Sequence, residues 1–121
     1  MGNKAKGIVT IDDKYAFRFT TNAMVELEDK LDMSIQQIVH LFETGRLGFK
    51  GLRSLVWAGL IHQFDNEDGT YDITEREAGD LIDEYGFDAI VEKLEMAIDY
   101  AFGDDDKPKA NREMRRKKIE E

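Results

Sequence analysis

The acidic stretch 65–72, DNEDGTYD, is the part of this sequence whose side chains come closest to a chemical motif. Carboxylate and amide oxygens at alternate positions before a glycine resemble an EF-hand calcium loop. With Asp65 as the first ligand, however, the sixth position is Thr70 instead of glycine, and the twelfth is Arg76 instead of a bidentate glutamate. We therefore expect a solvated loop between two helices and no calcium site.

The remaining reactive side chains form no catalytic constellation. His40 and His62 are the only two histidines, and they fall on separate predicted helices. Cysteine is absent, which excludes disulfides, thiolate chemistry and cysteine-rich zinc sites. No serine or threonine lies in a nucleophile elbow, and there is no glycine-rich phosphate loop. We expect a protein that is not an enzyme and that holds no metal and no cofactor.

The net charge of −9 is unevenly distributed along the 121 residues. Residues 104–121 carry seven lysines and arginines against six acids, so the preceding body carries −10. An acidic body repels nucleic acid and anionic membranes, so either could bind only through this C-terminal tail. The basic run 112–118 has no aromatic side chain on which bases could stack, and acids flank it. This favours a flexible tail, or one that folds on a protein partner, over nucleic-acid binding.

No apolar run approaches the roughly 20 residues that a membrane-spanning helix needs. The first ten residues also lack the apolar core of a secretion signal. We expect a soluble, unexported protein with no membrane partner.

The predicted helices and strands are organised around one segment, residues 49–64, FKGLRSLVWAGLIHQF. At 3.6 residues per turn its apolar side chains surround the helix axis, which predicts a buried central helix. These side chains are Phe49, Leu52, Leu55, Val56, Trp57, Leu60, Ile61 and Phe64. Gly51 and Gly59 inside it each cost about 1 kcal/mol relative to alanine. We therefore expect a neighbouring helix or strand pair to approach the backbone closely at both glycines.

Two short runs near the N-terminus, Ile8 to Ile11 and Tyr15 to Phe19, predict a β-hairpin with a polar turn between them. One face of the second run is aromatic, and an isolated hairpin is marginally stable, so the hairpin should pack on the helices.

Four further helices are predicted from capping signals and apolar spacing. They run from about Thr20 to Leu31, from Ser34 to Gly45, from Thr74 to Gly86, and from Phe87 to Gly103. The predicted fold is mainly α, a small helical domain of about five helices around a buried central helix, with an N-terminal β-hairpin. Its organisation would be a flexible N-terminus at 1–6, one domain at 7–103, and a charged flexible tail at 104–121.

Three segments resemble the small tail assembly chaperones of long-tailed bacteriophages, a family that includes a gene-transfer-agent tail protein. They are FRFTTNAMVELEDKLDMSIQQI at 17–38, GFKGLRSLVWAGL at 48–60, and TEREAGDLIDEYGFDAIVEKLEMAIDYAFG at 74–103. The resemblance extends from about Ile8 to Gly103 and includes the polar or glycine positions Glu26, Glu28, Gly59 and Gly86.

The resemblance implies a non-enzymatic role. Such a protein would bind the tape measure protein, keep it soluble, recruit tail tube subunits around it, and be absent from the finished particle. It would act in the cytoplasm of the bacterial host, and self-association into a homo-oligomer stays open. The alternatives are a structural or head–tail connector protein of the particle, or a regulator that binds nucleic acid through the basic tail.

A partner-binding surface can be predicted from the helices that carry more apolar residues than one face can bury. Large apolar side chains outside the cleanest stripes would then form a groove for an amphipathic helix of a partner. The residues expected there are Trp57, Leu60, Phe64 and Phe102.

Overall fold

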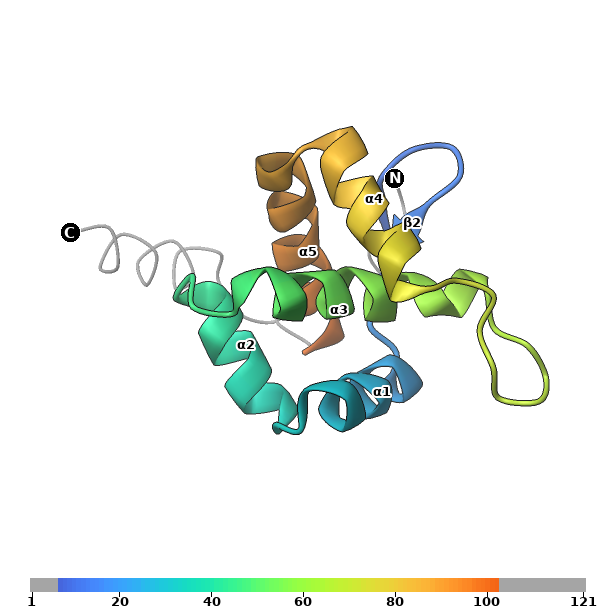
Figure 1. Ribbon diagram of the computed structural model, residues 1–121, viewed down its shortest axis with the longest axis horizontal. Helices are drawn as coiled ribbons and strands as arrows, with labels where there is room; N and C mark the ends of the chain where they lie inside the picture. The colour runs from blue at the N-terminus through green and yellow to red at the C-terminus, as the bar shows by residue number, and fades with distance from the viewer. Residues whose placement is uncertain (1–6, 103–121) are drawn as a thin grey trace.

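The helix α3, Gly48–Leu60, crosses the middle of the molecule, with α4 and α5 on one side of it and α1 and α2 on the other (Figure 1). The computed structural model describes residues 7–102. Within that range the chain forms a two-stranded antiparallel hairpin and five α-helices, so the predicted mainly α fold with an N-terminal hairpin is confirmed. The expected flexible segments at 1–6 and 104–121 lie outside the described residues.

The hairpin pairs β1, Val9–Thr10, with β2, Ala16–Phe17. The Asp12 carboxylate closes its turn by accepting hydrogen bonds from the backbone amides of Lys14 and Tyr15, each at 2.8 Å. An aspartate that bonds to amides two and three residues ahead is a common way to stabilise a tight turn.

Helices α1, Thr21–Leu31, and α2, Ile35–Glu43, follow the hairpin. The Thr20 hydroxyl caps α1, and Asp32 ends it in the left-handed region at φ 54°. Ser34 and Gln37 form the predicted capping box at the start of α2. The Glu28 carboxylate also accepts a hydrogen bond from the Ile35 amide at 2.8 Å, which ties the end of α1 to the start of α2.

The remaining helices are α4, Glu75–Tyr85, and α5, Phe87–Ala101. The second predicted capping box, between Thr74 and Glu77, opens α4. Gly86, at φ 95°, ends α4 and is followed directly by the first residue of α5.

The core lies around α3, which contacts α1, α4, α5 and β2. From Gly51 to Leu60 every residue of α3 except Arg53 is buried, which confirms the central helix. Its predicted end is wrong, because the α-helix stops at Leu60 and the chain tightens into the 3₁₀ turn η2, Ile61–Gln63. The prediction that Phe49, at its start, is buried is also wrong, because this side chain is 76% exposed.

The close approach predicted at Gly59 is present, and the hairpin makes it. A β-carbon on Gly59 would lie 2.8 Å from Cδ1 of Phe17 and 3.2 Å from Cζ of Phe19. The Arg18 amide also donates a hydrogen bond to the Gly59 carbonyl at 2.8 Å. At Gly51 the neighbour is instead the Leu47 side chain, from the turn just before α3, with Cγ at 2.5 Å from a β-carbon built there.

Candidate partner-binding surface

Two of the four residues predicted to form the partner surface are not at the surface. Trp57 is 6% exposed and Leu60 is fully buried, so the expectation that their side chains are exposed is wrong. Phe64 is half-buried, and only Phe102, at 43%, is exposed. The structure therefore does not bring these four residues together into one accessible groove.

Trp57 is buried because neighbouring elements enclose α3 on all sides and satisfy the indole. Its Nε1–H donates to the carbonyl of Ile73 at 2.8 Å, and its ring lies edge-to-face on Tyr71 at 5.7 Å. The Lys30 ammonium lies 4.5 Å above the indole centroid, within the range of a cation–π contact. These contacts give Trp57 a structural role.

Large apolar side chains are exposed at other positions of the described chain. Phe49 is the most exposed, at 76%, and Phe87 is 49% exposed. The other large exposed apolar residues are Val25, Met96 and Phe102. Scattered exposed apolar residues are common, but Phe49 and Phe87 are in contact, with ring centroids 5.9 Å apart in an edge-to-face arrangement.

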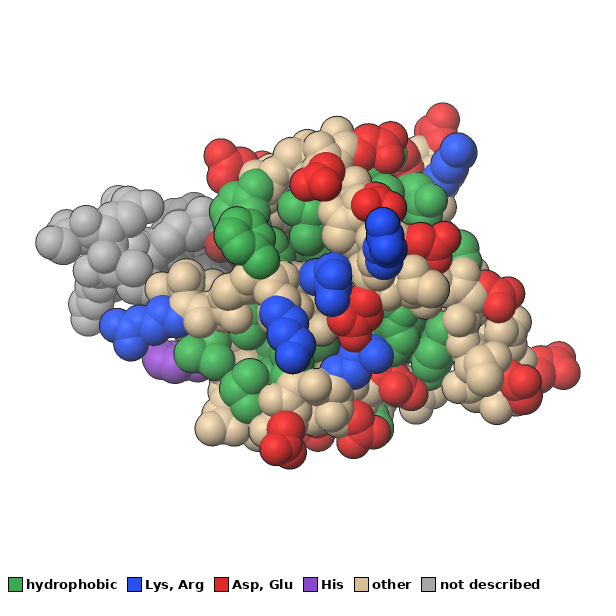
Figure 2. All heavy atoms as spheres, viewed as in Figure 1, with side chains coloured by type: hydrophobic (Ala, Val, Ile, Leu, Met, Phe, Trp, Pro, Cys, Tyr) green, Lys and Arg blue, Asp and Glu red, His purple; other side chains and the backbone are tan. Residues whose placement is uncertain are grey.

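The Phe49–Phe87 pair comes from the first turns of α3 and α5. Hydrophobic side chains gather at one edge of the molecule, with acidic side chains on one side of them and basic side chains on the other, along α3 (Figure 2). The sequence predicted Phe49 to lie in a buried helix and placed Phe87 at the start of the last helix. In the sequence, each phenylalanine directly follows a glycine at the start of a helix. This shared pattern is the signal that could have located the pair.

Basic side chains gather along α3 on the face shown in Figure 2, in a chain whose net charge is −9. The Glu75 carboxylate lies at their centre, 2.9 Å from Lys30 Nζ and 3.7 Å from an Arg53 guanidinium nitrogen. It also accepts a hydrogen bond from the buried Ser54 hydroxyl at 3.3 Å. Because these ion pairs are partly exposed, we expect each to contribute no more than about 1 kcal/mol.

His62 has a structural position against the hairpin. Its Nε2 lies 2.8 Å from the carbonyl oxygen of Ala16; because a carbonyl only accepts, this nitrogen carries the hydrogen and donates a hydrogen bond to that oxygen. Burial lowers the pKa of His62, and the nearby Arg18 charge acts in the same direction, while the bond to Ala16 opposes them. His40 is exposed on α2. The two histidines are thus held on different elements.

The polar side chains of the acidic loop before α4 form hydrogen bonds within the loop. Asp68 accepts hydrogen bonds from the Thr70 hydroxyl at 2.7 Å and from the Thr70 amide at 3.0 Å, and these bonds lower the pKa of Asp68. Asn66 donates to Thr70 and to Asp72. Across the described residues, no group of three or more histidines and carboxylates is placed to hold a metal ion.

Tyr71 connects this loop to α1. Its hydroxyl donates to the Glu26 carboxylate at 3.3 Å. Desolvation raises the pKa of Tyr71, and the adjacent Glu26 charge adds to that effect. The contact fixes the loop against the helical body.

Comparison with known proteins identifies a family. The model of the family described as "phage tail tube protein, GTA-gp10" matches residues 7–83, which is more than half of the chain. The chain therefore belongs to this family of phage tail proteins. No curated protein and no solved structure matches significantly. None of the described helices is both long enough and apolar enough to cross a membrane.

Proposed function

We propose that this phage tail protein is an assembly chaperone, which binds the tape measure protein, keeps it soluble and helps to recruit tail tube subunits. Membership of a phage tail family supports a role in tail biogenesis. The observation that carries the chaperone proposal is the exposure of several large apolar side chains on a strongly acidic body. The proposed role is non-enzymatic and needs no cofactor.

The physical basis is the covering of apolar helical stripes on a client. Val25 is 50% exposed on α1, Met96 is 39% exposed on α5, and Phe102 is 43% exposed just after α5. Fully burying a side chain of this size contributes about 1.5–3 kcal/mol, so a few such anchors are enough for reversible binding. The net negative charge of the chaperone would keep the complex dispersed.

Co-expression with the tape measure protein from the same genome tests the proposal. We expect the tape measure protein to become soluble and to co-elute with this chain from a sizing column. The double variant Met96→Ser with Phe102→Ser should lower the soluble fraction. The matched double variant Lys14→Ser with Gln36→Ser, at two exposed polar positions, should not. A tape measure protein that stays insoluble while this chain elutes alone would refute the proposal.

The second candidate is a structural component of the particle, a class that includes a head–tail connector. The family description favours it, because that description names a tail tube protein. Purified particles distinguish the two candidates. A structural subunit is retained in stoichiometric amounts, whereas an assembly chaperone is lost before the tail is complete.

A further inference from the structure

The two exposed phenylalanines lie in five-residue segments that have the same pattern but opposite charge. Residues 46–50 read RLGFK, and residues 84–88 read EYGFD. In each segment a charged residue stands three positions before the phenylalanine, a glycine directly before it, and a second charge of the same sign directly after it. We call these segments the basic arm and the acidic arm.

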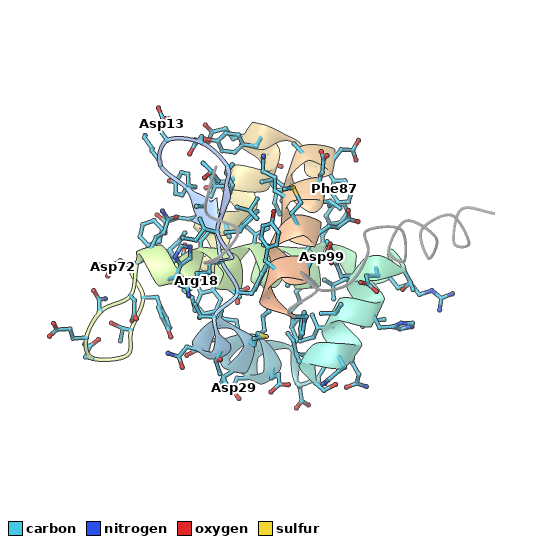
Figure 3. The ribbon with its side chains drawn as sticks, turned by 180° about the vertical axis from the view of Figure 1, so that it is seen from behind. Asp13, Arg18, Asp29, Asp72, Phe87 and Asp99 are labelled. Carbon is cyan, nitrogen blue, oxygen red and sulfur yellow. The ribbon has the colours of Figure 1, made fainter. Side chains whose placement is uncertain are left out.

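The backbone is also alike in the two arms. Gly48 has φ 82° and Gly86 has φ 95°, values that strongly favour glycine, and a helix begins at or directly after each. Both glycines therefore turn the chain so that the following phenylalanine sits in the first turn of its helix. Phe87 lies at the outer edge of α5, away from the hairpin (Figure 3).

The four charges of the arms are accessible. Arg46 and Lys50 in the basic arm are exposed, as are Glu84 and Asp88 in the acidic arm. The ion pairs formed among residues 7–102 join Glu75 to Lys30 and to Arg53, and involve none of these four side chains. The edge-to-face contact between Phe49 and Phe87 brings the two arms together. On this face, hydrophobic side chains have acidic side chains on one side and basic side chains on the other (Figure 2).

We propose that this surface binds the same surface of a second copy of the chain about a two-fold axis. In such a contact, if residue i of one copy touches residue j of the other, then j also touches i. The basic arm of each copy would face the acidic arm of the other, and the four phenylalanines would pack at the centre. One surface with an apolar middle and charges of opposite sign at its two ends meets that condition.

Charge complementarity selects a second copy over an unrelated partner. A basic segment of another protein would pair with the acidic arm and be repelled by the basic arm, and an acidic segment would meet the reverse problem. A second copy pairs all eight charges at once. Because both copies carry a net charge of −9, long-range repulsion opposes the contact, and a weak, concentration-dependent dimer is expected. This proposal does not depend on any client.

Sedimentation equilibrium of the full-length chain tests the dimer. The wild-type chain should approach twice the monomer mass as its concentration rises. Phe49→Ala should raise the dissociation constant about tenfold or more, as expected for a central aromatic contact. Because Phe49 is 76% exposed, this variant should keep the wild-type circular dichroism spectrum, and its unfolding midpoint should fall only slightly, through the lost contact with Phe87.

Charge reversal locates the interface. An acidic variant carries Arg46→Glu with Lys50→Glu, and a basic variant carries Glu84→Lys with Asp88→Lys. Each alone should be monomeric, because both arms then have the same sign. An equimolar mixture should restore the dimer, since every opposed pair of arms is again complementary.

A matched control removes the effect of net charge. Both variants keep a net negative charge, so general attraction cannot produce the restored dimer. The control pair places the same charge changes elsewhere, as Lys14→Glu with Arg76→Glu and as Asp13→Lys with Glu67→Lys, all at exposed positions. Each control variant should still form homodimers.

Three results would overturn the proposal. The first is a wild-type chain that stays monomeric up to about 1 mM, where even a very weak association would be detected. The second is a mixture of the acidic and basic variants that fails to dimerise. The third is growth beyond the dimer, which would show that the contact does not close about a two-fold axis and that another surface is in use.

Discussion

Replacement of Gly59 by alanine tests whether the hairpin and the central helix are packed as tightly as the structure indicates. In an open helix interior this change would stabilise the protein by about 1 kcal/mol, because alanine is the better helix former. Here the new methyl group would lie 2.8 Å from Phe17 and 3.2 Å from Phe19. Both rings are buried, at 0% and 6% exposure, so they cannot swing away into solvent.

The expected cost follows from two terms. Forcing a methyl group into a packed core costs about 1–3 kcal/mol. If the hairpin moves away to make room, the hydrogen bond from the Arg18 amide to the Gly59 carbonyl weakens, which costs about 0.5–1.5 kcal/mol more. After the gain in helix propensity is subtracted, we expect Gly59→Ala to lower the free energy of unfolding by about 2 kcal/mol.

Urea unfolding monitored by circular dichroism measures this change. For a domain of this size the midpoint should fall by roughly 1 M. Gly79→Ala in the interior of α4 is the matched control. There the new methyl group would meet only the Arg53 side chain, with Cδ at 3.0 Å and Cγ at 3.5 Å, and this side chain is flexible and exposed. Gly79→Ala should therefore leave stability unchanged or raise it by up to about 1 kcal/mol.

The reasoning would be refuted if Gly59→Ala were as stable as the wild-type chain with an unchanged slope of the urea dependence. That result would mean that the hairpin yields at no cost, and that the glycine is not required by packing. Equal destabilisation by Gly59→Ala and Gly79→Ala would also contradict it, because only the first site has rigid neighbours.

Three further substitutions test individual contacts. Thr74→Ala removes the hydroxyl that caps α4 and should cost about 1 kcal/mol in urea unfolding. Trp57→Phe keeps an aromatic side chain but removes the indole N–H, which leaves the buried carbonyl of Ile73 without its donor, so it should cost about 1–3 kcal/mol in the same assay. Burial lowers the pKa of His62, so unfolding takes up a proton, and stability should fall as pH drops from about 6.5 towards the lowered folded-state pKa. His62→Gln should abolish that component of the pH dependence of thermal unfolding, whereas His40→Gln should retain it.

Local sequence signals predicted the elements of this fold well. The two capping boxes lie where Ser34 and Thr74 placed them, because a cap depends on residues only three positions apart. The hairpin and the buried central helix were likewise predictable from alternation and from apolar density. Gly59 predicted a tertiary contact as well, because a glycine is unfavourable inside a buried helix and therefore indicated a close neighbour, which the structure shows.

The partner surface was not predictable in the same way. Trp57 and Leu60 were chosen because α3 has apolar residues on every side, and a helix of that kind has no face that sequence alone can identify as exposed. Tertiary contacts of α3 with α1, α4, α5 and β2 enclose this helix, and both residues are buried. Phe49 was expected to be buried for the same reason, yet it lies in the first turn of α3 and is 76% exposed. Only the arrangement of the neighbouring elements determines which of these apolar side chains is buried and which is exposed.

The stabilisation gained from the Phe49–Phe87 contact has to be compared with the cost of exposing the two aromatic rings to water. An edge-to-face pair contributes about 0.5–1.5 kcal/mol, so the pair helps to hold the starts of α3 and α5 together. Yet a ring that is 76% exposed leaves most of its apolar area in water, and burying that area would contribute more than the pair does. Within one chain, arms of opposite charge also favour this packing, because like charges brought so close together would repel. A contact between copies would use the same complementarity again, because each arm would also face the oppositely charged arm of the other copy. Mixing the acidic and basic variants tests that pairing directly.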